Sequence, residues 1–119
     1  MNAPVARALI VDDDAALRLL CRVNLELDGF EVREAASVVD AELAVESERP
    51  DVVLLDVHLG AEDALGLLDR LRSDGIPVAL VTGSADPDLF RDRADAVVTK
   101  PFDPQELVEI ARRLARVDA

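Results

Sequence analysis

Short apolar runs alternate along this chain with longer segments in which apolar residues recur every three or four positions. The short runs are typical of buried strands, and the longer segments are typical of helices that bury one face. Strands are predicted at about Ala6–Val11, Phe30–Ala35, Val52–Asp56, Val78–Thr82 and Ala96–Thr99. Because Phe30–Ala35 alternates apolar and polar residues, we expect it to lie at an edge of the sheet.

Helices are predicted in each interval that follows a strand. The expected helices are about Ala15–Leu27, a segment that Ser37 caps, Leu65–Arg72, a short segment that Asp86–Pro87 opens, and a segment that Asp103 caps. Asp14 is expected to cap the first of these helices rather than to bind a ligand. Five strand–helix units in 119 residues predict one α/β domain over residues 1–119, with a mostly parallel sheet.

Polar residues stand where four of the predicted strands end. Asp12 and Asp13 follow the first strand, Asp56 ends the third, Thr82 ends the fourth, and Lys100 follows the fifth. In a doubly wound sheet, ligands bind outside the carboxyl ends of the strands, so we expect these side chains to lie together. Lys100 is the only lysine of the chain, and its compact ammonium suits a small anion in a crowded pocket.

Gathered carboxylates favour one kind of chemistry. Two carboxylates about 4 Å apart repel each other by roughly 4 kcal/mol at an effective dielectric constant of about 20, so such a site takes up a proton or a cation. An all-oxygen site suits Mg²⁺, which commonly adds phosphate oxygens to its ligands, and a carboxylate can itself accept a phosphoryl group. Taken alone, Asp12 and Asp13 would be better explained as a polar loop. Together with Asp56, Thr82 and Lys100, they favour a site.

Composition narrows the classes of partner and location. The net charge of −12 would repel a phosphate backbone, so we expect no direct binding of nucleic acid by this domain. No apolar run reaches the roughly 18 residues of a membrane span, and the N-terminus lacks a signal-peptide pattern. With a single cysteine, these features predict a cytoplasmic protein. That cysteine, Cys21, is expected to be a buried core residue rather than a reactive thiol.

Four short motifs give the chain a family resemblance. They are Val11–Asp14 (VDDD), Leu54–Val57 (LLDV), Val81–Gly83 (VTG) and Thr99–Phe102 (TKPF). In this order, at strand ends and over essentially the whole chain, they resemble the receiver domain of bacterial two-component response regulators. The resemblance implies a flavodoxin-like fold, which is a doubly wound, five-stranded parallel sheet in the order 2-1-3-4-5 with helices on both faces.

The resemblance also implies which residues bind the phosphoryl group and the metal. Asp56 would accept the phosphoryl group, and Mg²⁺ would be the cofactor of the transfer. Asp13 would ligate Mg²⁺ directly, and Asp12 would bind it through water. Asp56 and the backbone carbonyl of His58 would complete the protein ligands.

Thr82 and Lys100 are implied to contact the phosphoryl group, and the Lys100–Pro101 peptide bond is implied to be cis. A sensor histidine kinase or a phosphotransfer protein would supply the group, and an output protein or domain that the sequence does not identify would respond to it. The resemblance therefore implies a signalling domain that catalyses only its own phosphorylation and dephosphorylation. It also implies a monomer or a weak dimer.

Three features depart from the usual pattern of that family. Val97 stands where the family often has an aromatic switch residue, so coupling of Thr82 to a ring is not expected there. The segment from Thr82 to Lys100 is about one helical turn short, which predicts a short or irregular helix near Pro87–Arg93. Gly60 replaces a common proline in the loop after the third strand, and its backbone freedom predicts a more mobile loop.

Two other functions fit parts of the pattern. A degenerate receiver would bind partners without phosphorylation, although the retained site residues weigh against it. A haloacid-dehalogenase-like phosphatase would also use Asp56 as a nucleophile with Mg²⁺, but its second aspartate would stand where the chain has His58. His58 is either a residue that tunes hydrolysis of the acyl phosphate or an ordinary solvent-facing loop residue, and Ser84 has the same two interpretations.

Overall fold

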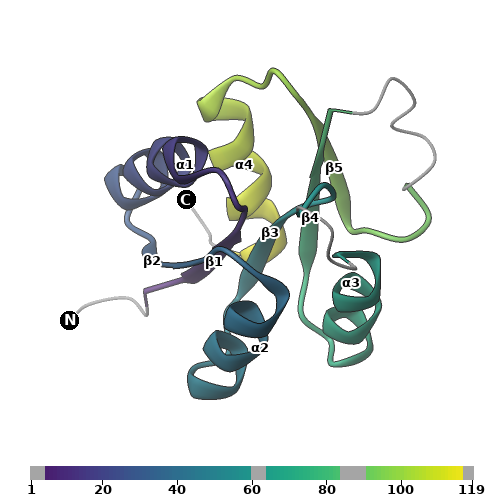
Figure 1. The fold of residues 1–119 in the computed structure, drawn as a ribbon. Coiled ribbons are helices and arrows are strands. Elements are labelled where there is room, and N and C mark those ends of the chain that lie inside the picture. Colours follow the sequence, from purple (N-terminus) through teal and green to yellow (C-terminus); the bar gives the residue numbers. More distant parts are fainter. Residues whose placement is uncertain (1–4, 60–63, 84–90, 117–119) are drawn as a thin grey trace.

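The computed structural model describes residues 5–59, 64–83 and 91–116, which form five strands and four helices. The strands are β1 (Arg7–Val11), β2 (Glu31–Ala35), β3 (Val52–Asp56), β4 (Val78–Thr82) and β5 (Ala96–Thr99). The helices are α1 (Ala15–Leu27), α2 (Val38–Ser47), α3 (Ala64–Ser73) and α4 (Pro104–Ala115). The strands pair in parallel in the order β2-β1-β3-β4-β5 (Figure 1), which confirms the doubly wound sheet.

The helices cover both faces of this sheet. Figure 1 shows α1 and α4 on one face and α2 and α3 on the other. Side chains alternate between the faces, so Leu54 packs in the cluster under α1 and α4, and its neighbour Leu55 packs in the cluster under α2 and α3. All residues of β3 are buried because this strand is central and covered on both sides. β2 lies at an edge, as its alternating pattern predicted.

Local capping explains where three helices begin. The side chains of Asp14, Ser37 and Asp103 accept hydrogen bonds from backbone N–H groups in the first turns of α1, α2 and α4. These N–H groups have no partner within the helix, so the caps satisfy them. The predicted caps are confirmed. α1 is followed by Asp28 and then by Gly29, whose φ of +98° lies in the region that favours glycine.

The observed elements differ from the predicted ones at some ends. β1 and β2 each begin one residue later than predicted, and α3 is one residue longer at each end. The short helix expected near Pro87–Arg93 falls mostly outside the described part of the chain, and residues 91–93 form a turn. Gly60 and Ser84 also lie outside the described residues, so the expectations for both stay predictions.

The structure tests what the composition predicted for Cys21 and for membrane-spanning helices. Cys21 is buried in the cluster under α1 and α4, which confirms it as a core residue. Its burial, together with the nearby Asp12 carboxylate, raises the pKa of the thiol to about 11 and keeps it protonated. No helix in the described part of the chain combines the length and the apolar character that crossing a membrane requires.

Candidate functional site

The carboxyl ends of β1, β3, β4 and β5 meet at one edge of the sheet, because these strands are parallel neighbours. Carboxylate oxygens of Asp12, Asp13 and Asp56 lie there within 4.8 Å of one another. The β4–β5 register pairs Thr82 with the residue that precedes Lys100. The structure therefore brings the acids and the Lys100 ammonium together, and it places Thr82 at the same edge of the sheet, as the strand-end pattern predicted.

Asp56 lies at the centre of this arrangement and is 3% exposed. Its Oδ2 atom is 3.1 Å from the ammonium nitrogen of Lys100. Its Oδ1 atom accepts a hydrogen bond of 2.9 Å from the backbone N–H of His58. Both oxygens of this buried carboxylate are thus engaged, which orients the side chain at the end of β3.

Asp12 is also buried, and it is held at several atoms. Its N–H donates to the carbonyl oxygen of Ala35 at 3.1 Å, and its Oδ1 accepts from the N–H of Asp14 at 2.9 Å. Burial raises the pKa of the Asp12 carboxyl to about 6, against an opposing effect of the Asp14 N–H, and the nearby Asp56 carboxylate raises it further. The buried acid pair therefore carries an electrostatic cost that a bound cation would relieve.

Thr82 and Lys100 are linked through the backbone. Thr82 is fully buried, and its carbonyl oxygen accepts a hydrogen bond of 2.8 Å from the N–H of Lys100. The side chain of Lys100 is 33% exposed, so its ammonium reaches Asp56 from the surface of the site. The Lys100–Pro101 peptide bond is cis, as the resemblance implied.

Asp13 and His58 lie at the solvent side of the site. Asp13 is exposed, although its carboxylate belongs to the cluster with Asp12 and Asp56. The His58 side chain is exposed as well, and the residue contacts the site through its backbone N–H. Among the described residues, the side chains close enough to share a metal ion are those of the three aspartates.

The donor set fits a hard divalent cation. Within the described residues, one ion pair involves any of these three carboxylates, and it joins Lys100 to Asp56. The negative charge of the cluster therefore exceeds the positive charge in contact with it. Carboxylate oxygens are the ligands that Mg²⁺ prefers, and one exposed acid beside two buried ones leaves room for the waters that Mg²⁺ keeps.

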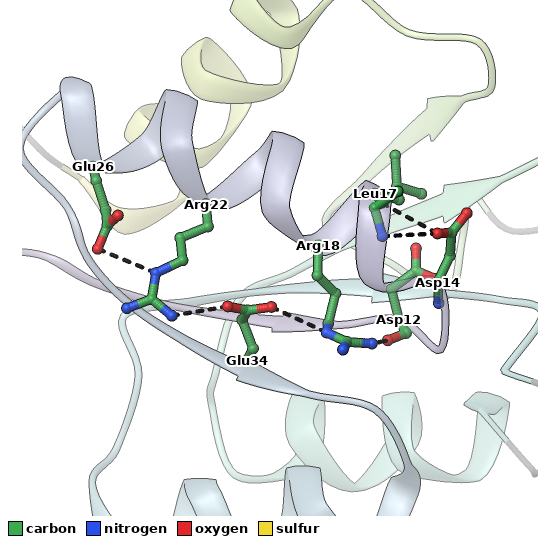
Figure 2. Close-up of polar contacts among 8 residues, drawn as sticks. Asp12, Asp14, Leu17, Arg18, Arg22, Glu26 and Glu34 are labelled. Carbon is green, nitrogen blue, oxygen red and sulfur yellow. Dashed lines mark hydrogen bonds and ion pairs between the residues drawn. The ribbon is translucent and has the colours of Figure 1, made fainter.

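Sequence reasoning missed two residues that hold this site, and Figure 2 shows them. Arg18 donates to the backbone oxygen of Asp12 at 2.7 Å and to a carboxylate oxygen of Glu34 at 3.0 Å. The signal was a break in the alternation of β2. Glu34 stands on the face that Phe30 and Val32 bury, where an apolar residue belongs. A charged residue on such a face indicates a partner in the helix that covers it.

Comparisons with known proteins agree on one family. Residues 8–112 match the response regulator receiver domain family. The chain is 37% identical over 124 residues to the DNA-binding response regulator MtrA of Mycobacterium tuberculosis, which covers 99% of this chain and 54% of that protein. It is 35% identical over 118 residues to the DNA-binding dual master transcriptional regulator RpaA of Synechocystis, which covers 92% of this chain and 49% of that protein. The chain thus spans about half the length of these curated relatives.

A solved structure is similar over nearly its whole length. The CheY-like response regulator receiver domain protein of Methanospirillum hungatei has 31% sequence identity and a TM-score of 0.83, and the match covers 95% of this chain and 96% of that one. The matched family, relatives and structure are all response regulators, so the phosphatase alternative is not favoured.

Proposed function

Because the chain belongs to the response regulator receiver domain family, we propose that Asp56 accepts a phosphoryl group from a sensor histidine kinase or a phosphotransfer protein. The family serves two-component phosphorelay signalling, and this chain is a signalling domain of that kind. One observation carries the proposal. Asp56 is a buried carboxylate with the acids Asp12 and Asp13 on one side and the ammonium of Lys100 at 3.1 Å on the other.

The proposed step is an attack by one Asp56 carboxylate oxygen on the phosphorus atom of a phosphohistidine. An O–P bond forms as the N–P bond breaks, and the electron pair of the broken bond returns to the imidazole nitrogen, which takes a proton. The product is an aspartyl-phosphate. Burial of Asp56 supports this step, because it limits the access of water to the acceptor and strengthens electrostatic contacts around it.

Asp12, Asp13 and Asp56 are the proposed carboxylate ligands of Mg²⁺, with the backbone carbonyl of His58 as a further ligand. When bound, the ion supplies positive charge that offsets the charge of the phosphoryl oxygens. The exposure of Asp13 supports direct ligation, because the ion can reach its carboxylate from solvent. Oδ1 of Asp12 already accepts a hydrogen bond from a backbone N–H, which supports a contact through water.

Thr82 and Lys100 are the proposed switch residues. Lys100 exchanges its pairing with Asp56 for a pairing with a phosphoryl oxygen, and the hydroxyl of Thr82 donates to another oxygen. These contacts exist only in the conformation of the phosphorylated domain, so they shift the population toward that conformation. An output protein or domain then binds the phosphorylated conformation. Val97 packs partly buried against the cluster under α2 and α3, and it offers no ring to this switch.

The exposed face of α1 is the proposed contact surface for the phosphodonor. Leu19, Leu20, Val23 and Leu27 are between 43% and 82% exposed, and they recur at helical spacing. α1 begins directly after the acidic residues Asp12–Asp14, so a partner that binds this face brings its phosphohistidine close to the site. Val23→Asp is expected to slow transfer from a kinase and to leave labelling by acetyl phosphate unchanged. Unchanged transfer from the kinase would count against this surface.

Domain organisation, location and oligomeric state concern the chain as a whole. Residues 1–119 are proposed to form one receiver domain that is cytoplasmic and is a monomer or a weak dimer. MtrA and RpaA are DNA-binding regulators, and this chain spans about half the length of each. The net charge of −12 supports a domain that does not contact nucleic acid directly.

The deciding experiment is intact mass spectrometry after incubation with acetyl phosphate and Mg²⁺. We expect one phosphoryl adduct that requires Mg²⁺, is removed by hydroxylamine and is absent in Asp56→Asn. The matched control is Asp14→Asn, which changes a neighbouring acid but preserves the helix cap, because asparagine caps as well as aspartate. This control is expected to label as the unchanged protein does.

Three results would contradict the proposal. Labelling of Asp56→Asn with the same yield would show that Asp56 is not the acceptor. Folded protein that takes up neither acetyl phosphate nor beryllofluoride would support a degenerate receiver. Turnover of small phosphate esters beyond one equivalent would instead revive the phosphatase alternative.

A further inference from the structure

A series of charged contacts links α1 and β2 to the end of β1, beside the acid pair (Figure 2). Arg18 of α1 contacts the backbone oxygen of Asp12 through Nη1 at 2.7 Å and Glu34 through Nε at 3.0 Å. The second carboxylate oxygen of Glu34 accepts from Arg22 at 2.8 Å, and Arg22 also pairs with Glu26 at 3.3 Å. The side chain of Arg18 is 18% exposed and that of Arg22 is 39% exposed, so solvent screens Arg18 less.

The carbonyl that Arg18 contacts belongs to the peptide between Asp12 and Asp13. Because a peptide unit is planar, the direction of this carbonyl sets the orientation of the backbone from which the Asp13 side chain projects. The N–H of Asp12 is held by Ala35 at 3.1 Å, and its carboxylate is held by the N–H of Asp14 at 2.9 Å. Arg18 adds a hydrogen bond to the carbonyl oxygen, so both the N–H and the carbonyl of Asp12 are hydrogen-bonded.

The charge of Arg18 has the wrong sign for a cation site. A guanidinium beside Asp12 and Asp13 repels Mg²⁺, so it would lower the affinity if charge were its only effect. Glu34 offsets this repulsion because its carboxylate lies between two guanidiniums (Figure 2). The guanidiniums of Arg22 and Arg18 hold the pKa of Glu34 below its usual range, so it stays ionised.

We infer that Arg18, oriented by Glu34, is a positioning residue of the Mg²⁺ site, which holds the Asp12–Asp13 peptide so that both carboxylates face the ion. The inference rests on the proposed function, because that function requires the ion. Arginine suits this task, since its fork reaches a carbonyl and a carboxylate at once. Groups that orient the ligands of a metal change its affinity by about 10–100-fold when they are lost.

If Arg18 acts mainly through its charge, its loss should raise the Mg²⁺ affinity, and if it acts mainly by positioning Asp12 and Asp13, its loss should lower that affinity. The variant Arg18→Met tests which effect dominates. Methionine keeps an apolar stem but removes the charge and both contacts. Positioning predicts Mg²⁺ binding about tenfold weaker by isothermal titration calorimetry, whereas loss of a repelling charge alone predicts tighter binding. Arg22→Met is the matched control, because it removes the same charge from the same network without a contact to Asp12. Equal or tighter binding by Arg18→Met would overturn the inference.

The variant Arg18→Lys provides a second test, because it keeps the positive charge. It also tests the positioning role if circular dichroism shows that Arg18→Met does not fold. One ammonium does not reproduce the two-point contact, so we expect severalfold weaker Mg²⁺ binding, and affinity equal to that of the unchanged protein would overturn the inference. Labelling by acetyl phosphate should need more Mg²⁺ for half-saturation and recover its maximal rate at saturation. An unchanged protein that does not bind Mg²⁺ would contradict the proposed function itself, whereas equal binding by all variants would contradict the positioning role alone.

Discussion

The two sides of the site flank Asp56 and are held in different ways. The acid side is Asp12 with Asp13, and the cation side is Thr82 with Lys100. On the acid side, the N–H, the carbonyl and the carboxylate of Asp12 each have a hydrogen-bond partner. On the cation side, the Lys100 backbone is tied to Thr82, and its partly exposed side chain is held by the ion pair with Asp56.

This difference shows which part of the site is organised before a ligand arrives. On the acid side, Asp12 is fixed by these hydrogen bonds although its burial is electrostatically costly, as its raised pKa indicates. Ligands that are fixed in advance bind an ion without the cost of reorganisation. Lys100 must exchange one partner for another when Asp56 is phosphorylated, so a side chain held by a single ion pair, within the described contacts, suits that task.

The largest expected effect separates the two sides by the sign of the change in Mg²⁺ affinity. Asp13→Asn should weaken binding by about 100-fold or more, since one carboxylate close to a cation contributes several kcal/mol at an effective dielectric constant of about 20. Lys100→Met should strengthen binding, because it removes a competing cation from Asp56. Calorimetric titration measures both, with Asp14→Asn as the neutral control. Effects of the same sign would mean that the two sides do not differ in this way.

A pH series tests the electrostatic cost of the acid side. The folded protein holds the Asp12 proton up to a pKa of about 6, whereas the unfolded chain releases it near 3.8. Between these values the folded state binds more protons, so its free energy of unfolding falls as the pH rises, by at most roughly 3 kcal/mol. Urea denaturation of metal-free protein across this range, with Asp12→Asn beside it, measures the difference. A variant with the same pH dependence as the unchanged protein would exclude Asp12 as its source.

Two hydrogen bonds hold the start of β4 and the turn before β5, at the ends of these strands that lie away from the site. Asp95 accepts a hydrogen bond of 2.8 Å from the N–H of Val78, and Arg72 donates to the carbonyl oxygen of Arg93 at 2.7 Å. Asp95→Ala leaves a buried N–H without this acceptor and should lower the free energy of unfolding by about 1–3 kcal/mol. Asp95→Asn keeps an acceptor oxygen and should lose less. Urea denaturation decides between them, and Mg²⁺ affinity should not change in either variant.

Removal of a helix cap is expected to have the smallest effect on the free energy of unfolding, and this effect should be the same on both sides of the site. Asp14 caps α1 beside the acid side, and Asp103 caps α4 after the cation side. Asp14→Ala and Asp103→Ala should each lower the free energy of unfolding by about 1 kcal/mol, because each removes acceptors for first-turn N–H groups. Thermal or urea denaturation measures the loss. A much larger loss at one cap would show that local stability, rather than the contacts of the site, distinguishes the two sides.

Much of the fold and of the candidate site could be predicted because the signals are local. Strands and helices follow from the period of apolar residues, and caps follow from side chains that bond within one turn. Parallel order then places Asp12, Asp56 and Lys100 at the same edge. The contact of Arg18 with the Asp12 carbonyl was missed, because a pattern of residue types does not reveal which backbone oxygen a long side chain reaches.

The sequence alone was enough to predict the types of the described strands and helices, the caps of α1, α2 and α4, and the alternation of side chains between the two faces of the sheet. It also determined which residues stand at the strand ends. These features depend on neighbours a few positions apart. Packing in three dimensions set the rest: the 3.1 Å contact between Lys100 and Asp56, the pKa of Asp12 and the hold of Arg18 on the acid loop. Each of these depends on burial and on the distance between groups on different elements, and those quantities exist only once the chain has folded.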